Sequence, residues 1–366
     1  MSSTYENTEP ESSLPLSMQI FDADRYLPSL EDVFELKEIL FNAPKERRLP
    51  LEIIESIIDL AEYWPHTTTS GFAIPGSQDN RLLVNTRKEI TVRSGARTEN
   101  QFLLRSLPIG YFSSQENKHD LPFQKRLEDE TEFTKVEPKP WLWPSDRQIP
   151  QDATEEVIKQ WAEVSPCRSQ FPCKKIIFRI RSHDQGWGGA SADRGTYRGS
   201  FTWFDVGLER TYATREEHFV KDPHFRPCDY KQESSNEIVC GVRTIIPEVV
   251  QPNPDDVPEN HRDSSATHPA TFKHKLNPDT KALQKNKTAT ATPESHVITW
   301  RFDDNIHPES PEADKLEEQG RGRETGNGEF VRNLRIGDVV TLWAKARYPG
   351  WSNTIQDVSM EVYYAI

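Results

Sequence analysis

The stretch Asp357-Val-Ser-Met-Glu-Val-Tyr-Tyr-Ala-Ile366 decides the fold class. Apolar residues occupy every second position, and they are Val358, Met360, Val362, Tyr364 and Ile366. Side chains two residues apart point to the same face of a β-strand, so this spacing predicts a strand with one buried face. We expect the last residues of the chain to be tied into a sheet.

Short runs with β-like character recur upstream of this strand. We expect further strands over 89–93, 174–181, 196–205, 237–246, 296–302 and 338–348. Helical segments do not alternate with them, as they would in a parallel sheet. The sequence therefore predicts a mainly β fold, an antiparallel β-sandwich of the jelly-roll or galactose-binding-like kind.

Composition divides the chain into three parts. Residues 1–20 are rich in Ser, Glu, Thr and Pro and are expected to form a disordered tail. Residues 21–68 predict a helical pair, and residues 69–366 the β-sandwich domain. Residues 251–295 contain few large apolar side chains, so we expect a disordered insertion within that domain.

The predicted helices carry recognisable start signals. Ser29-Leu-Glu-Asp32 fits a loose capping box, and Pro50 suits the first turn of a second helix that Pro65 stops. A further helix is expected over 152–161, with Asp152 as its cap.

A glycine-tryptophan corner covers residues 182–205 and begins Ser182-His-Asp-Gln-Gly-Trp-Gly-Gly189. Glycine serves where a backbone turns sharply, and exposed aromatic rings serve in recognition. With the segment around Tyr348-Pro-Gly-Trp351, it predicts a ligand-binding surface. Its candidate residues are Asp184, Gln185, Trp187, Trp203, Arg347, Tyr348, Trp351 and Asn353.

The alternative for this corner is purely structural. Trp187 and Trp351 would then plug the ends of the sandwich, and Asp184 would cap a turn. If the corner is a site, the loop of Trp351 must lie beside it. His183 and Asp184 are neighbours in extended chain and point to opposite faces, so they do not form a catalytic pair. We expect a protein that is not an enzyme.

The net charge and the spacing of the cysteines limit which classes of partner the protein can bind. The formal net charge of −13 argues against nucleic acid. No apolar stretch is long enough to span a membrane, and no secretory signal is seen, so we expect a soluble, intracellular protein in the cytoplasm or the nucleus.

The four cysteines, Cys167, Cys173, Cys228 and Cys240, do not match a zinc pattern, although His218 or His224 could join them. We expect no metal and no cofactor.

Several blocks resemble a family of uncharacterised fungal proteins. They are Cys173 to Ile180, Ser182 to Gly189, Gly199-Ser-Phe-Thr-Trp-Phe-Asp205, Gly207 to Arg210, Phe330 to Asp338, Leu342-Trp-Ala-Lys-Ala-Arg-Tyr-Pro-Gly-Trp351 with the following Ser352 and Asn353, and the Pro50 to Trp64 helix. The resemblance covers less than half of the chain. It implies a fungal origin and one shared domain, without an activity.

A second resemblance concerns the helical pair. Leu49-Pro-Leu-Glu-Ile-Ile54 resembles the opening of an F-box, which docks substrate adaptors onto ubiquitin ligases. This resemblance implies a ligase scaffold as partner through residues 49–64, although Pro65 breaks the pattern at once. The alternative is an amphipathic pair packed on the sandwich.

The sequence thus favours a non-catalytic intracellular binding or interaction protein that uses the glycine-tryptophan corner. Its ligand, a protein or a glycan, stays open. The alternatives are a ubiquitin-ligase adaptor and an intracellular glycan-binding module.

Overall fold

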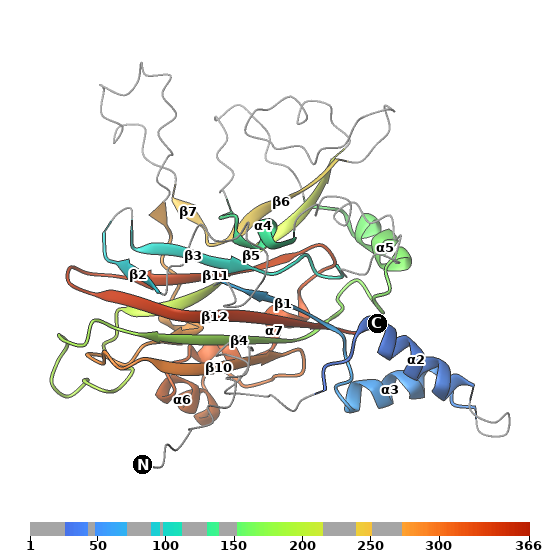
Figure 1. Ribbon diagram of the computed structural model, residues 1–366, viewed down its shortest axis with the longest axis horizontal. Helices are drawn as coiled ribbons and strands as arrows, with labels where there is room; N and C mark the ends of the chain where they lie inside the picture. The colour runs from blue at the N-terminus through green and yellow to red at the C-terminus, as the bar shows by residue number, and fades with distance from the viewer. Residues whose placement is uncertain are drawn as a thin grey trace, which may run out of the picture.

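The described part of this computed structural model is a sandwich of two antiparallel sheets with helices around it (Figure 1). The structure describes residues 26–42, 48–71, 89–95, 98–111, 130–138, 152–214, 239–250 and 273–366. Each of the two main sheets has five strands. The predicted antiparallel β-sandwich is therefore confirmed, while its assignment to a jelly-roll or galactose-binding-like type stays a prediction.

The first sheet is built around the last strand of the chain. Its order is β1 (His66–Ser70), β12 (Ser352–Tyr364), β4 (Cys173–His183) and β10 (Glu294–Arg301), and β2 (Ile90–Arg93) also pairs with β12. Met360 lies opposite Phe178 in this register, and both side chains are fully buried. The predicted alternation of β12 therefore sets the register, because a slip by one residue would exchange its apolar side chains with Ser359, Glu361 and Tyr363 of the opposite face.

The second sheet packs against the first. Its order is β3 (Asn100–Arg105), β11 (Val339–Ala346), β5 (Thr202–Thr214) and β6 (Val239–Ile246), and β9 (Gln284–Lys285) pairs with the start of β5. Val340, Leu342 and Ala344 of β11 point into the core. A small hairpin pairs β7 (Val249–Val250) with β8 (Lys273–His274).

Helices lie around the sandwich. They are α2 (Leu30–Phe41), α3 (Leu51–Leu60), α4 (Glu130–Lys135), α5 (Glu155–Val164), α6 (Pro311–Glu318) and α7 (Glu329–Arg332), with 3-10 turns η6 (Asp279–Lys281) and η7 (Arg323–Gly326). The predicted helical pair corresponds to α2 and α3. Ser29 caps α2 in a complete capping box with Asp32. Within the described residues, no helix is long and apolar enough to cross a membrane.

Two of the predicted elements need correction. The strand expected over 196–205 begins only at Thr202, because the glycines before it shape a loop. Thr154, not Asp152, caps α5, since the Thr154 hydroxyl accepts from the backbone of Val157. The predicted strands 89–93, 174–181, 237–246, 296–302 and 338–348 correspond to β2, β4, β6, β10 and β11.

The predicted insertion over 251–295 is also wrong in its second half. Residues 273–295 include β8, η6, β9 and the start of β10. Leu283, Asn286 and Thr288 are buried there, so polar contacts order a segment that has few large apolar side chains. Residues 251–272, like the tail 1–20, lie outside the described residues.

Candidate functional site

The glycine-tryptophan corner is organised by the buried carboxylate of Asp184. Its Oδ1 accepts from the backbone N–H of Gly186 at 2.7 Å and of Thr290 at 2.9 Å, and its Oδ2 accepts from Ala289 at 2.8 Å. The side chain is 0% exposed. A carboxylate that accepts several backbone N–H groups fixes the chain around it. Asp184 therefore joins the loop after β4 to the segment before β10.

Gln185 connects the corner to the loop between β11 and β12. Its Nε2 donates to the carbonyl of Trp187 at 2.7 Å, and its Oε1 accepts from the backbone of Ser352 at 3.0 Å. Gly350 has a φ of +90°, and a Cβ there would lie 2.9 Å from Cη2 of Trp187. The indole therefore rests directly on the glycine. The expected adjacency of the two loops is confirmed.

These two loops gather four aromatic side chains, which we call the aromatic rim: Trp187, Phe201, Tyr348 and Trp351. Trp187 is 62% exposed and Tyr348 is 61% exposed. The ring of Phe201 packs edge-on against Tyr348 at 4.5 Å and against Trp351 at 5.1 Å between centroids. The rim therefore presents exposed rings whose positions are set by packing and by a rigid β scaffold.

Asn353 belongs to a buried polar network beneath the rim. Its Nδ2 donates to the carbonyls of Trp203 and Lys345, and its Oδ1 accepts from Nδ2 of Asn286 at 2.9 Å. The Oδ1 of Asn286 accepts in turn from the Ser182 hydroxyl at 2.7 Å. Asn353 is completely buried and fully hydrogen-bonded, so it supports the loops from below.

Trp203 and Arg347 lie apart from Trp187, on the outer face of the second sheet. The Trp203 indole donates to Oδ1 of Asp205 at 2.9 Å. The Arg347 guanidinium lies 5.6 Å from the centre of that indole ring, and it donates to the Asn100 side chain at 2.8 Å. These two candidates therefore belong to a second, buried cluster.

This outer-face cluster contains three strongly perturbed titratable groups. Lys345 Nζ is 2.7 Å from Nδ1 of His274 and 3.0 Å from the Asn100 oxygen. Burial lowers the pKa of Lys345 to about 8, and burial with the charges of Lys345 and Arg347 lowers the pKa of His274 to about 3. Burial raises the pKa of Asp205. The groups are engaged with one another and nearly inaccessible, so they belong to the packing around β11 and not to an open binding surface.

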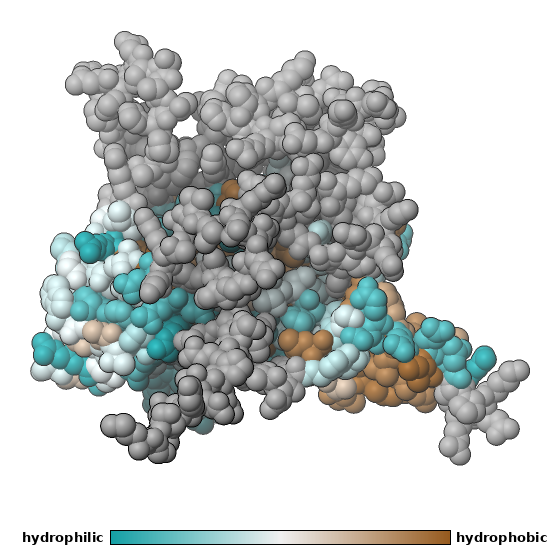
Figure 2. Space-filling view, viewed as in Figure 1, coloured by the Kyte–Doolittle hydropathy of each residue, from teal (hydrophilic) through white to brown (hydrophobic). Residues whose placement is uncertain are grey.

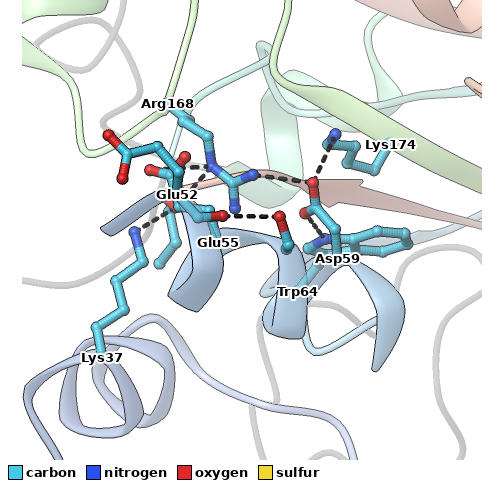
Figure 3. A network of polar contacts seen from close by, with 9 residues as sticks. Lys37, Glu52, Glu55, Asp59, Trp64, Arg168 and Lys174 are labelled. Carbon is cyan, nitrogen blue, oxygen red and sulfur yellow. Dashed lines mark hydrogen bonds and ion pairs between the residues drawn. The ribbon is translucent and has the colours of Figure 1, made fainter. Parts of the chain in front are cut away.

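The helical pair is attached to the sandwich by the polar network of Figure 3. Oδ2 of Asp59 accepts from Arg168 at 2.9 Å and from Lys174 at 3.2 Å, while its Oδ1 accepts from the Trp64 indole at 2.9 Å. Burial raises the pKa of Asp59, but these donors outweigh burial and lower it overall. Lys37 of α2 donates to the main-chain oxygen of Ile366 at 2.5 Å. Thus α2 is fixed to Ile366, beyond the end of β12, and α3 is fixed to Arg168 and to β4.

Exposed apolar side chains gather on the helical pair, and we call this surface the apolar face of the helical pair. Figure 2 shows this hydrophobic surface over α2 and α3. Leu60 is 87% exposed, and the other exposed side chains are Phe34, Ile39, Phe41, Leu51, Ile53 and Ile57. Ile54 and Ile58 cover the opposite, buried side of α3. Grouped apolar exposure of this kind marks interaction surfaces.

The cysteines that the structure describes behave as core residues. Cys167 and Cys173 are buried free thiols, and burial raises the pKa of Cys167 to about 12. In the described ranges, no three His, Cys, Asp or Glu side chains are placed to hold a metal. Cys228, His218 and His224 lie outside the described residues, and Cys240 is the second residue of β6.

Comparison of the chain with protein-family models, curated proteins and solved structures gives no match. The site is therefore interpreted from its own geometry. Phe201 is the rim residue that the sequence interpretation missed, because it was assigned to a strand with Trp203. Its place between two loops depends on Arg347, whose backbone N–H donates to the Phe201 carbonyl.

Proposed function

We propose that this protein is a non-catalytic binding protein whose ligand stacks on the aromatic rim. The observation that carries the proposal is the exposure of Trp187 and Tyr348 on loops that buried polar groups hold rigid. Exposed indole and phenol rings lose little conformational freedom on binding, so a rigid pair of this kind contributes large contact area at low entropic cost.

Ring stacking favours ligands with a flat apolar face. Carbohydrates present such faces through their C–H bonds, and peptides present them through proline and aromatic side chains. Exposed polar groups also lie in the corner, for example Arg198. We therefore propose a glycan or a peptide as ligand, bound inside the cell as the sequence predicts, in a protein of the fungal family that the sequence blocks resemble.

The test is binding to an oligosaccharide array and, in parallel, to a peptide library. Trp187→Ala and Tyr348→Ala should each abolish binding of a hit while leaving the midpoint of thermal unfolding nearly unchanged, because both side chains are mostly exposed. Phe171→Ala is the matched control. Phe171 is an aromatic residue that is 42% exposed, and it precedes the start of β4, whereas the corner follows the end of that strand. Hits that bind all three variants equally, or unfolding of the rim variants, would contradict the proposal.

A second candidate function rests on the apolar face of the helical pair. We propose that residues 49–64 dock a partner protein, for which the F-box resemblance suggests a ubiquitin-ligase scaffold. The supporting observation is the exposure of Leu60, Ile57 and Ile53 along one side of α3 while its other side is buried.

Co-purification with ligase scaffold components tests this candidate. Leu60→Asp should abolish capture without loss of stability, whereas Leu276→Asp, at a side chain that is 59% exposed elsewhere, should leave capture intact. If the unaltered protein captures no scaffold component, the adaptor function is wrong.

A further inference from the structure

Two arginines lie directly opposite each other on β5 and β6. Arg210 pairs with Arg243 in the register of these strands. Arg210 follows Val206 and Leu208 in steps of two, so it shares their inward face. Like charges at directly opposed positions destabilise a sheet unless a counter-charge lies between them. The pair therefore needs an anion.

Part of that counter-charge comes from Asp152. The Oδ1 of Asp152 accepts from Nε of Arg243 at 2.9 Å and also from its Nη2. A third arginine, Arg335, brings Nη2 to 3.6 Å from Oδ2 of Asp152, and Nη1 of Arg210 lies 3.8 Å from the same oxygen. Three guanidinium groups thus converge on one carboxylate.

The cluster carries more positive than negative charge. Among the residues that the structure describes, the only other carboxylate in its ion pairs is Asp338, whose Oδ1 is 3.6 Å from Nε of Arg210. Three guanidinium groups against two carboxylates leave one positive charge. Burial and the charges of Arg210 and Arg243 oppose the charged form of Arg335 and lower its pKa, while Asp338 and Asp152 raise it.

The hydrogen-bonding capacity of the cluster is also unfilled. Distances of 3.6–3.8 Å exceed hydrogen-bond length, and in the described residues Nε of Arg210 and both Nε and Nη2 of Arg335 find no acceptor. The three side chains stay 18–24% exposed, so a solute can contact them, while the three nitrogens without acceptors are themselves buried. Buried donors without acceptors are costly, which favours an incoming acceptor.

We propose that Arg210, Arg243 and Arg335 form a binding site for a tetrahedral oxyanion, namely a phosphoryl group that is either free or carried by a small metabolite. Guanidinium forks match the paired oxygens of phosphate, and three forks from β5, β6 and the loop before β11 surround one point. Asp152 marks that point, because its carboxylate already lies where the guanidinium groups meet. The site is distinct from the aromatic rim and independent of it.

Isothermal titration with sodium sulfate and sodium phosphate, against sodium chloride at equal ionic strength, tests the site. We expect saturable binding of sulfate and phosphate only. Arg335→Gln should weaken it at least tenfold, because it removes a charge-assisted donor fork. Arg93→Gln is the matched control, since Arg93 is exposed on β2 and its side chain has no partner within the described residues.

Asp152→Asn separates an anion site from an internal ion network. It keeps an acceptor for Arg243 but removes a negative charge, so it should tighten sulfate binding several-fold. Weaker binding in Asp152→Asn, unchanged binding in Arg335→Gln, or no difference between sulfate and chloride would each overturn the proposal. Glycerol 3-phosphate forms the last arm: tighter binding than inorganic phosphate assigns the site to a metabolite, and equal or weaker binding assigns it to the free anion.

Discussion

Asp184 offers the sharpest test of how the corner is built. Asp184→Ala leaves the partly buried backbone N–H groups of Gly186, Ala289 and Thr290 without their acceptor. At about 1 kcal/mol or slightly more for each orphaned donor, the loss of unfolding free energy should be about 3–4 kcal/mol. Asp184→Asn keeps Oδ1 for two donors and sets an NH₂ against the third, so about half of that loss is expected.

Urea unfolding at pH 7 measures these losses. Asp193→Ala is the control in the same loop. Within the described residues the Asp193 side chain has one loose ion pair, of 3.8 Å, with a largely exposed Arg198, so the variant should cost less than about 0.5 kcal/mol. Amide exchange should speed up from Gly186 to Gly199 in Asp184→Ala. A loss below about 1 kcal/mol would refute the assigned scaffolding role. Equal losses in the Ala and Asn variants would show that charge, not acceptor geometry, matters.

Three further predictions concern the charged groups. The folded-state pKa of His274 is about 3, below its unfolded value, so the unfolded state takes up the proton first and stability falls as pH drops through 6.5. His274→Gln should remove about 2 kcal/mol of the loss between pH 7 and pH 5 in urea titrations. Asp59→Asn weakens the bonds to Arg168 and Lys174, so amide exchange in α3 should rise while that of β4 stays unchanged. Burial raises the pKa of Asp338 to about 6, so sulfate should bind more tightly at pH 5 than at pH 7, and Asp338→Asn should abolish this difference.

The strands could be predicted where the pattern is local. The alternation of Val358, Met360 and Val362 is enough to predict β12, because residues two apart line one face of a strand and apolar residues there identify the buried face. Residues 273–295 could not be predicted in this way. Their order depends on Asn286 and other polar side chains whose partners, such as Ser182, lie about a hundred positions away.

The candidate site also has residues that a local sequence pattern predicts and residues whose role depends on distant partners. Trp187, Tyr348 and Trp351 were predicted from residue type, and the structure brings their loops together. Asp184 and Asn353 are predicted site residues because polar side chains beside aromatic rings suit a ligand. In the fold their oxygens accept from the protein itself, and the sequence does not reveal which distant donor each oxygen meets. The three arginines were missed for the same reason, since their pairing depends on the register of β5 and β6.

The aromatic rim and the apolar face of the helical pair lie at opposite ends of the sandwich, and β12 runs between them (Figure 1). Its 13 residues from Ser352 to Tyr364 span roughly 40 Å at the usual rise of a strand. Surfaces this far apart share no side chain, so their contributions should be independent. A Trp187→Ala, Leu60→Asp double variant should therefore lose rim ligand and docking partner to the same extent as the single variants. Loss of partner capture in Trp187→Ala alone would show instead that the two ends are coupled through the sheet.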